Sequence, residues 1–78
     1  MNNLFAKKLR KLREERGLSQ KQLGEKLYVN HSTVARWENA SRLPDATMLL
    51  RIAGCLDVDI NSLLQLAAQS DESPNAQQ

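Results

Sequence analysis

The chain has 78 residues, room for one small domain, with 41% apolar residues and a net charge of +2. Its apolar runs fall well short of a membrane span of about 20 residues, and its first residues lack the features of a signal peptide, so we expect a cytoplasmic protein. One cysteine excludes an internal disulfide, and one histidine without neighbouring ligands argues against a metal site.

The first predicted helix covers about residues 3–16. Phe5, Leu9 and Leu12 recur at the spacing of one helical face, which predicts that this face packs against the rest of the domain. Gly17 follows in the position just past a helix end, where glycine adopts left-handed backbone without steric cost.

The start of the second helix, expected to run to about Leu27, carries a clear local signal. Ser19 and, three residues later, Gln22 form a capping box, in which each side chain bonds the other residue's backbone N–H. Leu18 before the cap and Leu23 four residues after it complete a hydrophobic staple.

Weaker forms of this start signal predict three further helices. Asn30, Asp45 and Asp59 are the expected N-cap residues, since short polar side chains accept bonds from free backbone N–H groups. No stretch alternates apolar and polar residues as a half-buried strand does. We therefore expect an all-α domain of five helices over residues 4–68, followed by a disordered polar tail over residues 69–78.

The net charge hides an asymmetry between the two halves of the chain. Residues 1–43 carry ten lysines and arginines against four glutamates, whereas residues 44–78 carry one arginine against five acidic residues. This division indicates that a polyanion docks on the N-terminal half. A solvated helix face that pairs its own charges explains the same composition. Composition alone therefore does not distinguish the two interpretations, and the sequence motifs are needed.

Residues 20–39 have the layout of a helix-turn-helix, in which two short helices meet at a steep angle. Gly24 supplies the small residue needed where they cross. Other pairs of apolar helices show similar spacing, so the surface of the third helix carries the functional argument. The small core shared by the two helices is expected to hold Leu23, Leu27, Val29, Val34 and Trp37.

The outward side of the third helix carries groups that read DNA bases, and its first turn is the part that reaches base edges. Arginine makes bidentate bonds to guanine O6 and N7, and serine and neutral histidine donate or accept. Alanine packs on a thymine methyl group. The expected base contacts are His31, Ser32, Ala35 and Arg36.

Residues on either side of the third helix are candidates for the DNA backbone. Gln20 lies in the first turn of the second helix, where free backbone N–H groups also favour phosphate. Asn39 and Arg42 follow the third helix and are expected to hold the backbone on the other side.

Taken together, these residues resemble the Xre-type, lambda-repressor-like DNA-binding family. The resemblance covers about residues 6–66, and its motifs are specific in combination although each is weak alone. It is carried by Leu9-Arg10-Lys11-Leu12-Arg13, by Gly17-Leu18-Ser19-Gln20 with Leu23, by Ser32-Thr33-Val34 with Arg36-Trp37-Glu38, and by Pro44, Leu49, Ile52-Ala53, Leu56-Asp57-Val58 and Leu63-Leu64.

The resemblance implies a role for each matched position. Arg13 and Glu38 would form an ion pair that joins the first helix to the third helix. A partly buried charge is left behind if either partner is lost, so the pair is expected to be structural. The other implied roles are a phosphate contact for Gln20, base-facing positions for His31, Ser32 and Arg36, and backbone-flanking positions for Thr33, Asn39 and Arg42.

The chain departs from the family at three turns where glycine is common, which here hold Tyr28, Ala40 and Asp57. Left-handed backbone is free for glycine and tolerated by aspartate, whereas tyrosine and alanine adopt it at a steric cost. Either the local backbone differs at these turns or the domain gives up stability. Gly24 replaces the family's usual alanine and lowers helix propensity by up to about 1 kcal/mol.

The sequence therefore predicts a regulator that binds double-stranded DNA sequence-specifically, and we expect a repressor. The alternative is a protein-interaction or adaptor module, such as an antitoxin, on the same fold. An apolar stripe on the third helix would favour that alternative, and its polar, basic surface favours DNA.

We expect neither an enzyme nor a cofactor or small-molecule ligand. The sequence shows no nucleophile with a base, no paired buried carboxylates and no glycine-rich phosphate loop. A homodimer is expected through the fifth helix and the end of the fourth, because Leu64 and Leu66 cannot both face one narrow core. Two half-sites about 34–36 Å apart would then add specificity.

Overall fold

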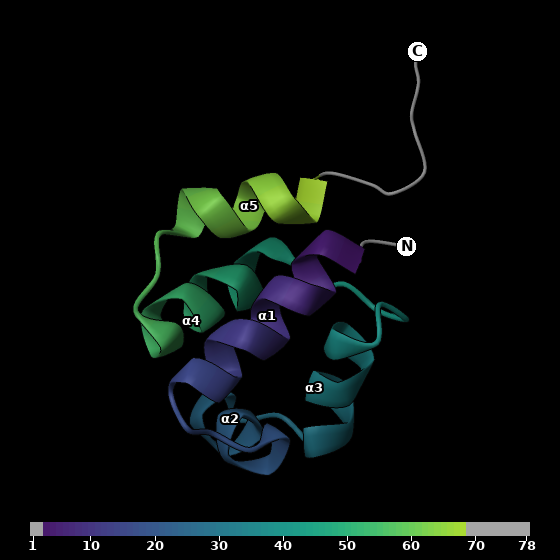
Figure 1. Cartoon of the computed structure of the whole chain (residues 1–78), viewed down its shortest axis with the longest axis vertical. Helices are drawn as coiled ribbons and strands as arrows, with labels where there is room; N and C mark the ends of the chain where they lie inside the picture. The colour runs from purple at the N-terminus through teal and green to yellow at the C-terminus, as the bar shows by residue number, and fades with distance from the viewer. Residues whose placement is uncertain (1–2, 69–78) are drawn as a thin grey trace.

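The computed structural model describes residues 3–68, which form five helices and contain no strand (Figure 1). The all-α, five-helix fold expected from the sequence is thereby confirmed, while the tail predicted over residues 69–78 lies outside the described residues. The helices are α1 (Asn3–Glu15), α2 (Gln20–Leu27), α3 (His31–Glu38), α4 (Ala46–Leu56) and α5 (Ile60–Ala68).

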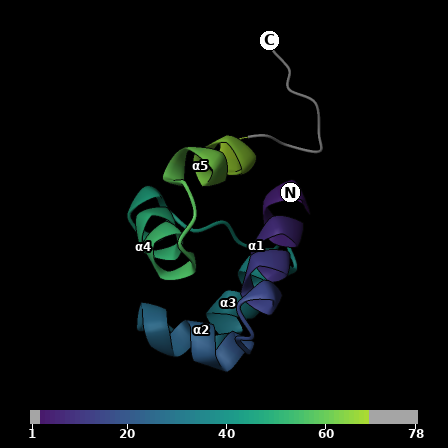
Figure 2. The same cartoon turned by 60° about the vertical axis from the view of Figure 1, so that its left-hand side comes forward.

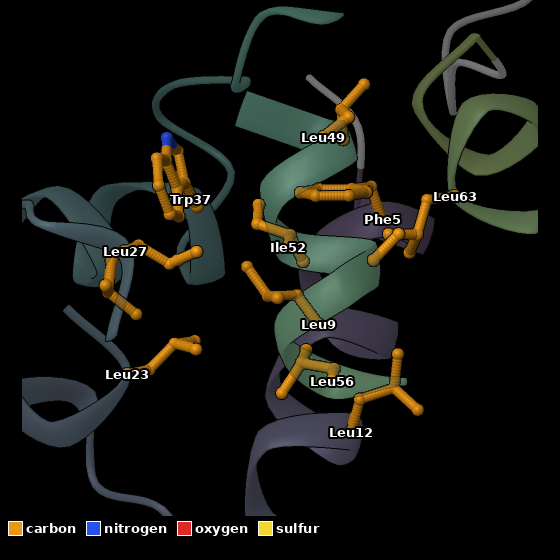
Figure 3. Close-up of a cluster of buried hydrophobic side chains, with 12 residues drawn as sticks. Phe5, Leu9, Leu12, Leu23, Leu27, Trp37, Leu49, Ile52, Leu56 and Leu63 are labelled. Carbon is orange, nitrogen blue, oxygen red and sulfur yellow. The ribbon is translucent and has the colours of Figure 1, made fainter. Parts of the chain in front are cut away.

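The five helices enclose one core (Figure 3). α2 packs against α3, α4 packs against α5, and α1 contacts both α3 and α5. Figures 1 and 2 place α2 and α5 at opposite ends of the domain. Burial of each large apolar side chain contributes about 1.5–3 kcal/mol, and all five helices supply such side chains. The buried cluster comprises Phe5, Leu9, Leu12, Leu23, Leu27, Val34, Trp37, Leu49, Ile52, Ala53, Leu56 and Leu63.

The predicted start of α2 is confirmed in detail. Ser19 Oγ accepts a bond of 3.0 Å from the backbone N–H of Gln22, and Gln22 Oε1 accepts one of 2.8 Å from the backbone N–H of Ser19. Asp45 caps α4 in the same way, accepting from the N–H of Met48 at 2.9 Å. Asn30 occupies the N-cap position of α3 but makes no capping bond with its side chain, so that part of the prediction is wrong.

Four helices end in one repeated arrangement. One or two residues after the last helical residue the backbone is left-handed, with φ of 69° at Gly17, 61° at Tyr28, 66° at Ala40 and 57° at Asp57. The next residue along donates its N–H to the carbonyl five residues back, as in the bond of 2.9 Å from Val29 to Gly24. The left-handed backbone usual for glycine is therefore kept, which excludes a different local backbone at Tyr28 and Ala40. We expect these two residues to lower the stability of the domain.

The close approach of this turn explains the glycine in α2. A Cβ atom on Gly24 would lie 2.6 Å from the carbonyl oxygen of Val29, which is closer than real Cβ atoms come to a neighbour. The turn between α2 and α3 thus packs directly on the Gly24 backbone. The tight turn therefore requires a residue without a Cβ atom at this position, and the lower helix propensity of glycine accompanies that requirement.

Replacing Tyr28 tests the left-handed turn. Left-handed backbone costs a residue with a side chain about 1–2 kcal/mol, and the greater freedom of glycine in the unfolded chain offsets about 0.5–1 kcal/mol of that. Because the Tyr28 side chain is 89% exposed and adds little packing, Tyr28→Gly should raise the free energy of unfolding by about 0.5–1 kcal/mol in urea denaturation.

Tyr28→Ala is the matched control, since it removes the same ring but keeps a Cβ atom. We expect it to leave stability close to that of the wild type. Gly17→Ala should have the opposite effect to Tyr28→Gly, because it places a Cβ on left-handed backbone. Equal stabilisation by glycine and alanine at position 28 would contradict the argument.

Candidate nucleic-acid interface

The side of α3 that faces away from the core is polar. Val34 and Trp37 are buried on one side of the helix, whereas His31, Ser32 and Arg36 are exposed. At 3.6 residues per turn, Ser32 and Arg36 point most directly away from the buried side. The sequence-predicted base-reading residues thus share the solvent side of α3, with Ala35 half-buried at its edge.

A groove runs along one flank of α3, between this helix and the segment that leads into α4. It encloses about 360 Å³, and its polar lining includes Thr33, Arg36 and Arg42. The backbone N–H of Arg42 donates to the carbonyl of Arg36 at 3.2 Å, so this segment is tied to the end of α3. Two arginines and one carboxylate residue, Asp45, line the groove, so its net charge is positive and favours a bound anion. The arginine side chain matches the geometry of a phosphate group.

Asn39 ends α3 and shapes the segment that follows. Its Oδ1 accepts a bond of 2.9 Å from the backbone N–H of Ser41. This bond uses the acceptor of the amide and orients its nitrogen, which carries the donors that a phosphate needs. Asn39 is exposed, as a contact to the DNA backbone requires.

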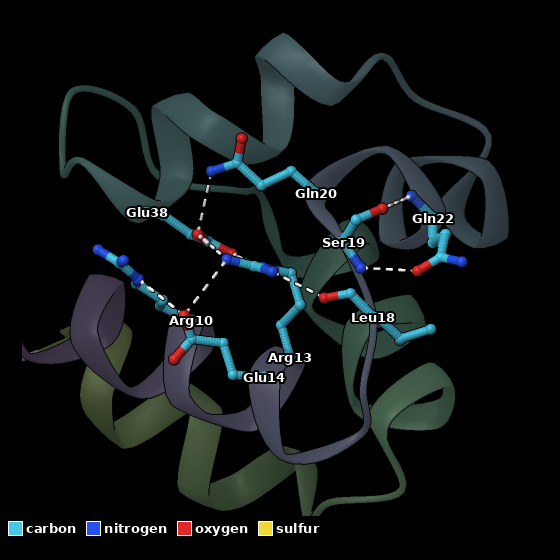
Figure 4. A network of polar contacts seen from close by, with 8 residues as sticks. All are labelled: Arg10, Arg13, Glu14, Leu18, Ser19, Gln20, Gln22 and Glu38. Carbon is cyan, nitrogen blue, oxygen red and sulfur yellow. Dashed lines mark hydrogen bonds and ion pairs between the residues drawn. The ribbon is translucent and has the colours of Figure 1, made fainter.

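The opposite flank of α3 holds a buried ion pair (Figure 4). Arg13 Nε donates to Glu38 Oε2 at 2.6 Å and Arg13 Nη2 donates to Glu38 Oε1 at 3.0 Å, which is a bidentate pair. The side chains are 10% and 4% exposed, respectively. The hydrogen bond that Arg13 donates to Glu38 raises the pKa of Arg13 although burial opposes the shift, so the guanidinium stays charged.

Two further contacts extend this pair to α2. Arg13 Nη1 donates to the carbonyl oxygen of Leu18 at 2.7 Å, and Gln20 Nε2 donates to Glu38 Oε1 at 3.2 Å. Sequence reasoning missed the bond between Gln20 and Glu38. The two residues are 18 positions apart on different helices, and no local pattern indicates the contact.

The candidate phosphate-binding residues therefore lie on both flanks of α3. Gln20 lies on the flank of Glu38, whereas Thr33 and Arg42 line the groove on the other flank. A helix in the major groove has a DNA strand on either side. The arrangement thus matches a helix that reads bases along its outward side and is held from both sides.

The described residues contain no sign of two other kinds of site. Among residues 3–68, no three His, Cys, Asp or Glu side chains are grouped so that they hold a metal ion. None of the five helices in that range is long and apolar enough to cross a membrane.

A sequence model of the helix-turn-helix family matches residues 9–63. The chain therefore belongs to this Xre-type, lambda-repressor-like helix-turn-helix family. This agrees with the geometry of α2 and α3 and with the resemblance of the sequence.

Two curated proteins are similar to the chain. The HTH-type transcriptional activator BcrR of Enterococcus faecalis is 37% identical over 60 residues, which cover 77% of this chain and 29% of that protein. The uncharacterized HTH-type transcriptional regulator YqaE of Bacillus subtilis (strain 168) is 32% identical over 62 residues, which cover 80% of this chain and 53% of that protein. The matched region is thus about half of one relative and less than a third of the other.

A solved structure shares the fold. The crystal structure of SinR, described as the master regulator for biofilm formation, in complex with DNA matches with a TM-score of 0.71 and 28% sequence identity. The match covers 77% of this chain and 97% of that chain.

Breaking the buried ion pair should destabilise the domain. Glu38→Leu leaves the charge of Arg13 buried without its carboxylate, and such a loss costs about 3 kcal/mol. We expect the free energy of unfolding in urea to fall by about this amount. The combined variant Arg13→Met with Glu38→Leu should recover most of the loss, because no uncompensated charge remains. A double variant as unstable as the sum of both single variants would show that the charges are not coupled.

Proposed function

We propose that the chain is a sequence-specific regulator of transcription that places α3 in the major groove of double-stranded DNA. The observation that carries the proposal is the polar outward side of α3 with candidate phosphate-binding groups on both flanks. Family membership and the fold shared with a SinR structure solved in complex with DNA support it. A regulator of this kind works in the cytoplasm and needs no catalytic residue, cofactor or small-molecule ligand.

Each residue has a proposed role on the DNA. Arg36 binds a guanine, and Ser32 and His31 donate to or accept from neighbouring base edges. Ala35, half-buried at the edge of α3, packs on a thymine methyl group. The backbone contacts are Gln20 on one flank, Thr33 and Arg42 on the other, and Asn39 at the C-terminal end of α3.

A protein-binding module is the less favoured role. A protein partner of α3 would need apolar groups on the outward side of the helix, and the exposed groups there are polar. None of the exposed leucines belongs to α3: Leu4 lies on α1, Leu50 on α4 and Leu64 on α5, while Leu43 lies in the segment after α3 and lines the groove beside it. Repression stays a prediction, because a relative that shares this domain is named as an activator.

We also propose a homodimer through α5 and the end of α4. Leu66 packs against the core and is half-buried, whereas Leu64 is 40% exposed. α5 lies at the end of the domain away from α2, so a second copy on α5 leaves the outward side of α3 open (Figure 1). A two-fold dimer would place two copies of α3 on half-sites about one helical turn apart.

Selection of bound sequences from a random pool of DNA duplexes tests the function. We expect the pool to converge on a sequence in which two half-sites are related by two-fold symmetry. Arg36→Ala should lose preference at one base pair per half-site, at a cost of about 1–3 kcal/mol in binding free energy. Arg51→Ala is the control, since it removes an exposed cation of α4 that lies outside the interface.

The outcome separates the possible roles of Arg36. An equal loss on all sequences would make Arg36 a phosphate contact rather than a base contact. A pool that never converges, or that yields no bound DNA, would refute sequence-specific binding.

Replacing Leu64 tests the dimer. Leu64→Lys puts a charge into the proposed interface, so it should shift the protein towards monomer in sedimentation at tens of micromolar and weaken binding to the two-half-site duplex at least tenfold. Binding to a single half-site should stay unchanged. Leu50→Lys is the control, because Leu50 is also exposed but lies in the first half of α4. A wild-type protein that stays monomeric with and without DNA would rule out the dimer.

A further inference from the structure

We propose that Glu38 is a positioning residue whose carboxylate fixes the side-chain amide of Gln20 so that its second N–H faces a DNA phosphate. The inference rests on the proposed function and adds a residue that itself touches no DNA. It comes from the bond of 3.2 Å between Gln20 Nε2 and Glu38 Oε1. This bond joins the first residue of α2 to the last residue of α3.

The carboxylate selects one of two orientations of the Gln20 amide. An ionised carboxylate only accepts hydrogen bonds, whereas an amide accepts at its oxygen and donates at its nitrogen. A flipped amide would set its oxygen against a negative oxygen of Glu38, so the nitrogen stays on this side (Figure 4). One N–H of Gln20 is used by Glu38, and the other remains to donate. A DNA phosphate, which only accepts, matches that donor.

Glu38 is itself held in place. Arg13 donates to both of its carboxylate oxygens, at 2.6 and 3.0 Å, and the carboxylate is almost fully buried. Arg13 also donates to the carbonyl of Leu18, two residues before Gln20, so the bonds close a ring around the start of α2. The charge of Arg13 offsets that of Glu38, which would otherwise repel a nearby phosphate.

This arrangement should favour binding by removing an ordering step. A free glutamine side chain loses rotational freedom when it binds a phosphate, whereas an amide that is already fixed has little left to lose. We therefore expect release of the Gln20 amide to weaken DNA binding by about 3- to 10-fold.

A double-mutant cycle tests the proposal on the duplex selected from the random pool. The four proteins are the wild type, Gln20→Ala, Glu38→Gln and the double variant. Glu38→Gln keeps the size of the side chain, but an amide accepts and donates and so no longer selects one orientation of Gln20. Binding should weaken about 3- to 10-fold on Glu38→Gln in the wild-type background, and less than about 2-fold when Gln20 is already alanine.

Two outcomes of this cycle would overturn the positioning role of Glu38. Equal losses from Glu38→Gln in both backgrounds, or no loss in either, would show that Glu38 does not act through Gln20. Ile52→Val controls for lost stability, because it trims a fully buried core residue of α4 outside the interface and should bind DNA as the wild type does. A wild-type protein that binds no duplex would refute the proposed function itself.

A spectroscopic measurement on the free wild-type protein needs neither a variant nor DNA. ¹⁵N relaxation of the Gln20 side-chain NH₂ group should show the restricted motion of a bonded amide, comparable with the backbone of α2. Rapid free rotation of this group would overturn the proposal. In Glu38→Gln the same signal should become more mobile, while that of Gln22, whose amide is bonded to Ser19 and not to Glu38, stays unchanged.

Discussion

The bidentate bond between Arg13 and Glu38 sets the orientation of α3, on which the proposed DNA interface depends. Helices much shorter than about 12 residues are not stable alone in water, so α3, with eight residues, takes its position from its contacts. Burial of Val34 and Trp37 holds it against the core, but apolar contacts are non-directional and tolerate rotation. The arginine fork has a fixed geometry and limits that rotation, so it helps to keep outward the polar side of α3 that lies opposite Val34 and Trp37.

The division of charge along the chain has two separate causes in the fold. Part of the basic charge of α1 is neutralised locally, since Arg10 pairs with Glu14 one turn away at 3.2 Å. Arg36 and Arg42 instead line a groove beside α3. The solvated face is the interpretation that fits the pair on α1, whereas docking of a polyanion on the flank of α3 stays a proposal.

Local signals predicted the helices because they act over a few residues. The capping box at Ser19 and the cap at Asp45 depend on neighbours three positions away, and both bonds are present. The turn at Tyr28 could not be derived from residue type, since tyrosine disfavours its left-handed backbone. The bond from Val29 to Gly24 closes that turn around a glycine with no room for a Cβ atom.

The residues of the candidate site could be predicted from the sequence more fully than the hydrogen bonds between them. The outward positions of α3 follow from the helical period alone, so Ser32 and Arg36 were identified from the sequence. The contact between Gln20 and Glu38 depends on how α2 and α3 cross. The spacing of apolar residues predicts that the two helices cross, but it does not predict which polar side chains meet there. Asn30 shows the same limit, because its cap position was predictable whereas the behaviour of its side chain was not.

Few buried side chains hold α5 to the core, so dimerisation through α5 would be coupled to local unfolding of this helix. Within α5, residues 60–68, only Leu63 is fully buried, so this helix has less apolar burial to lose than α4 when it detaches. Detachment would also uncover the apolar surface of α1 and α4 that α5 covers. In the proposed dimer a second copy would bind only the docked helix, so protein concentration would set how often α5 opens and, with it, the apparent melting temperature.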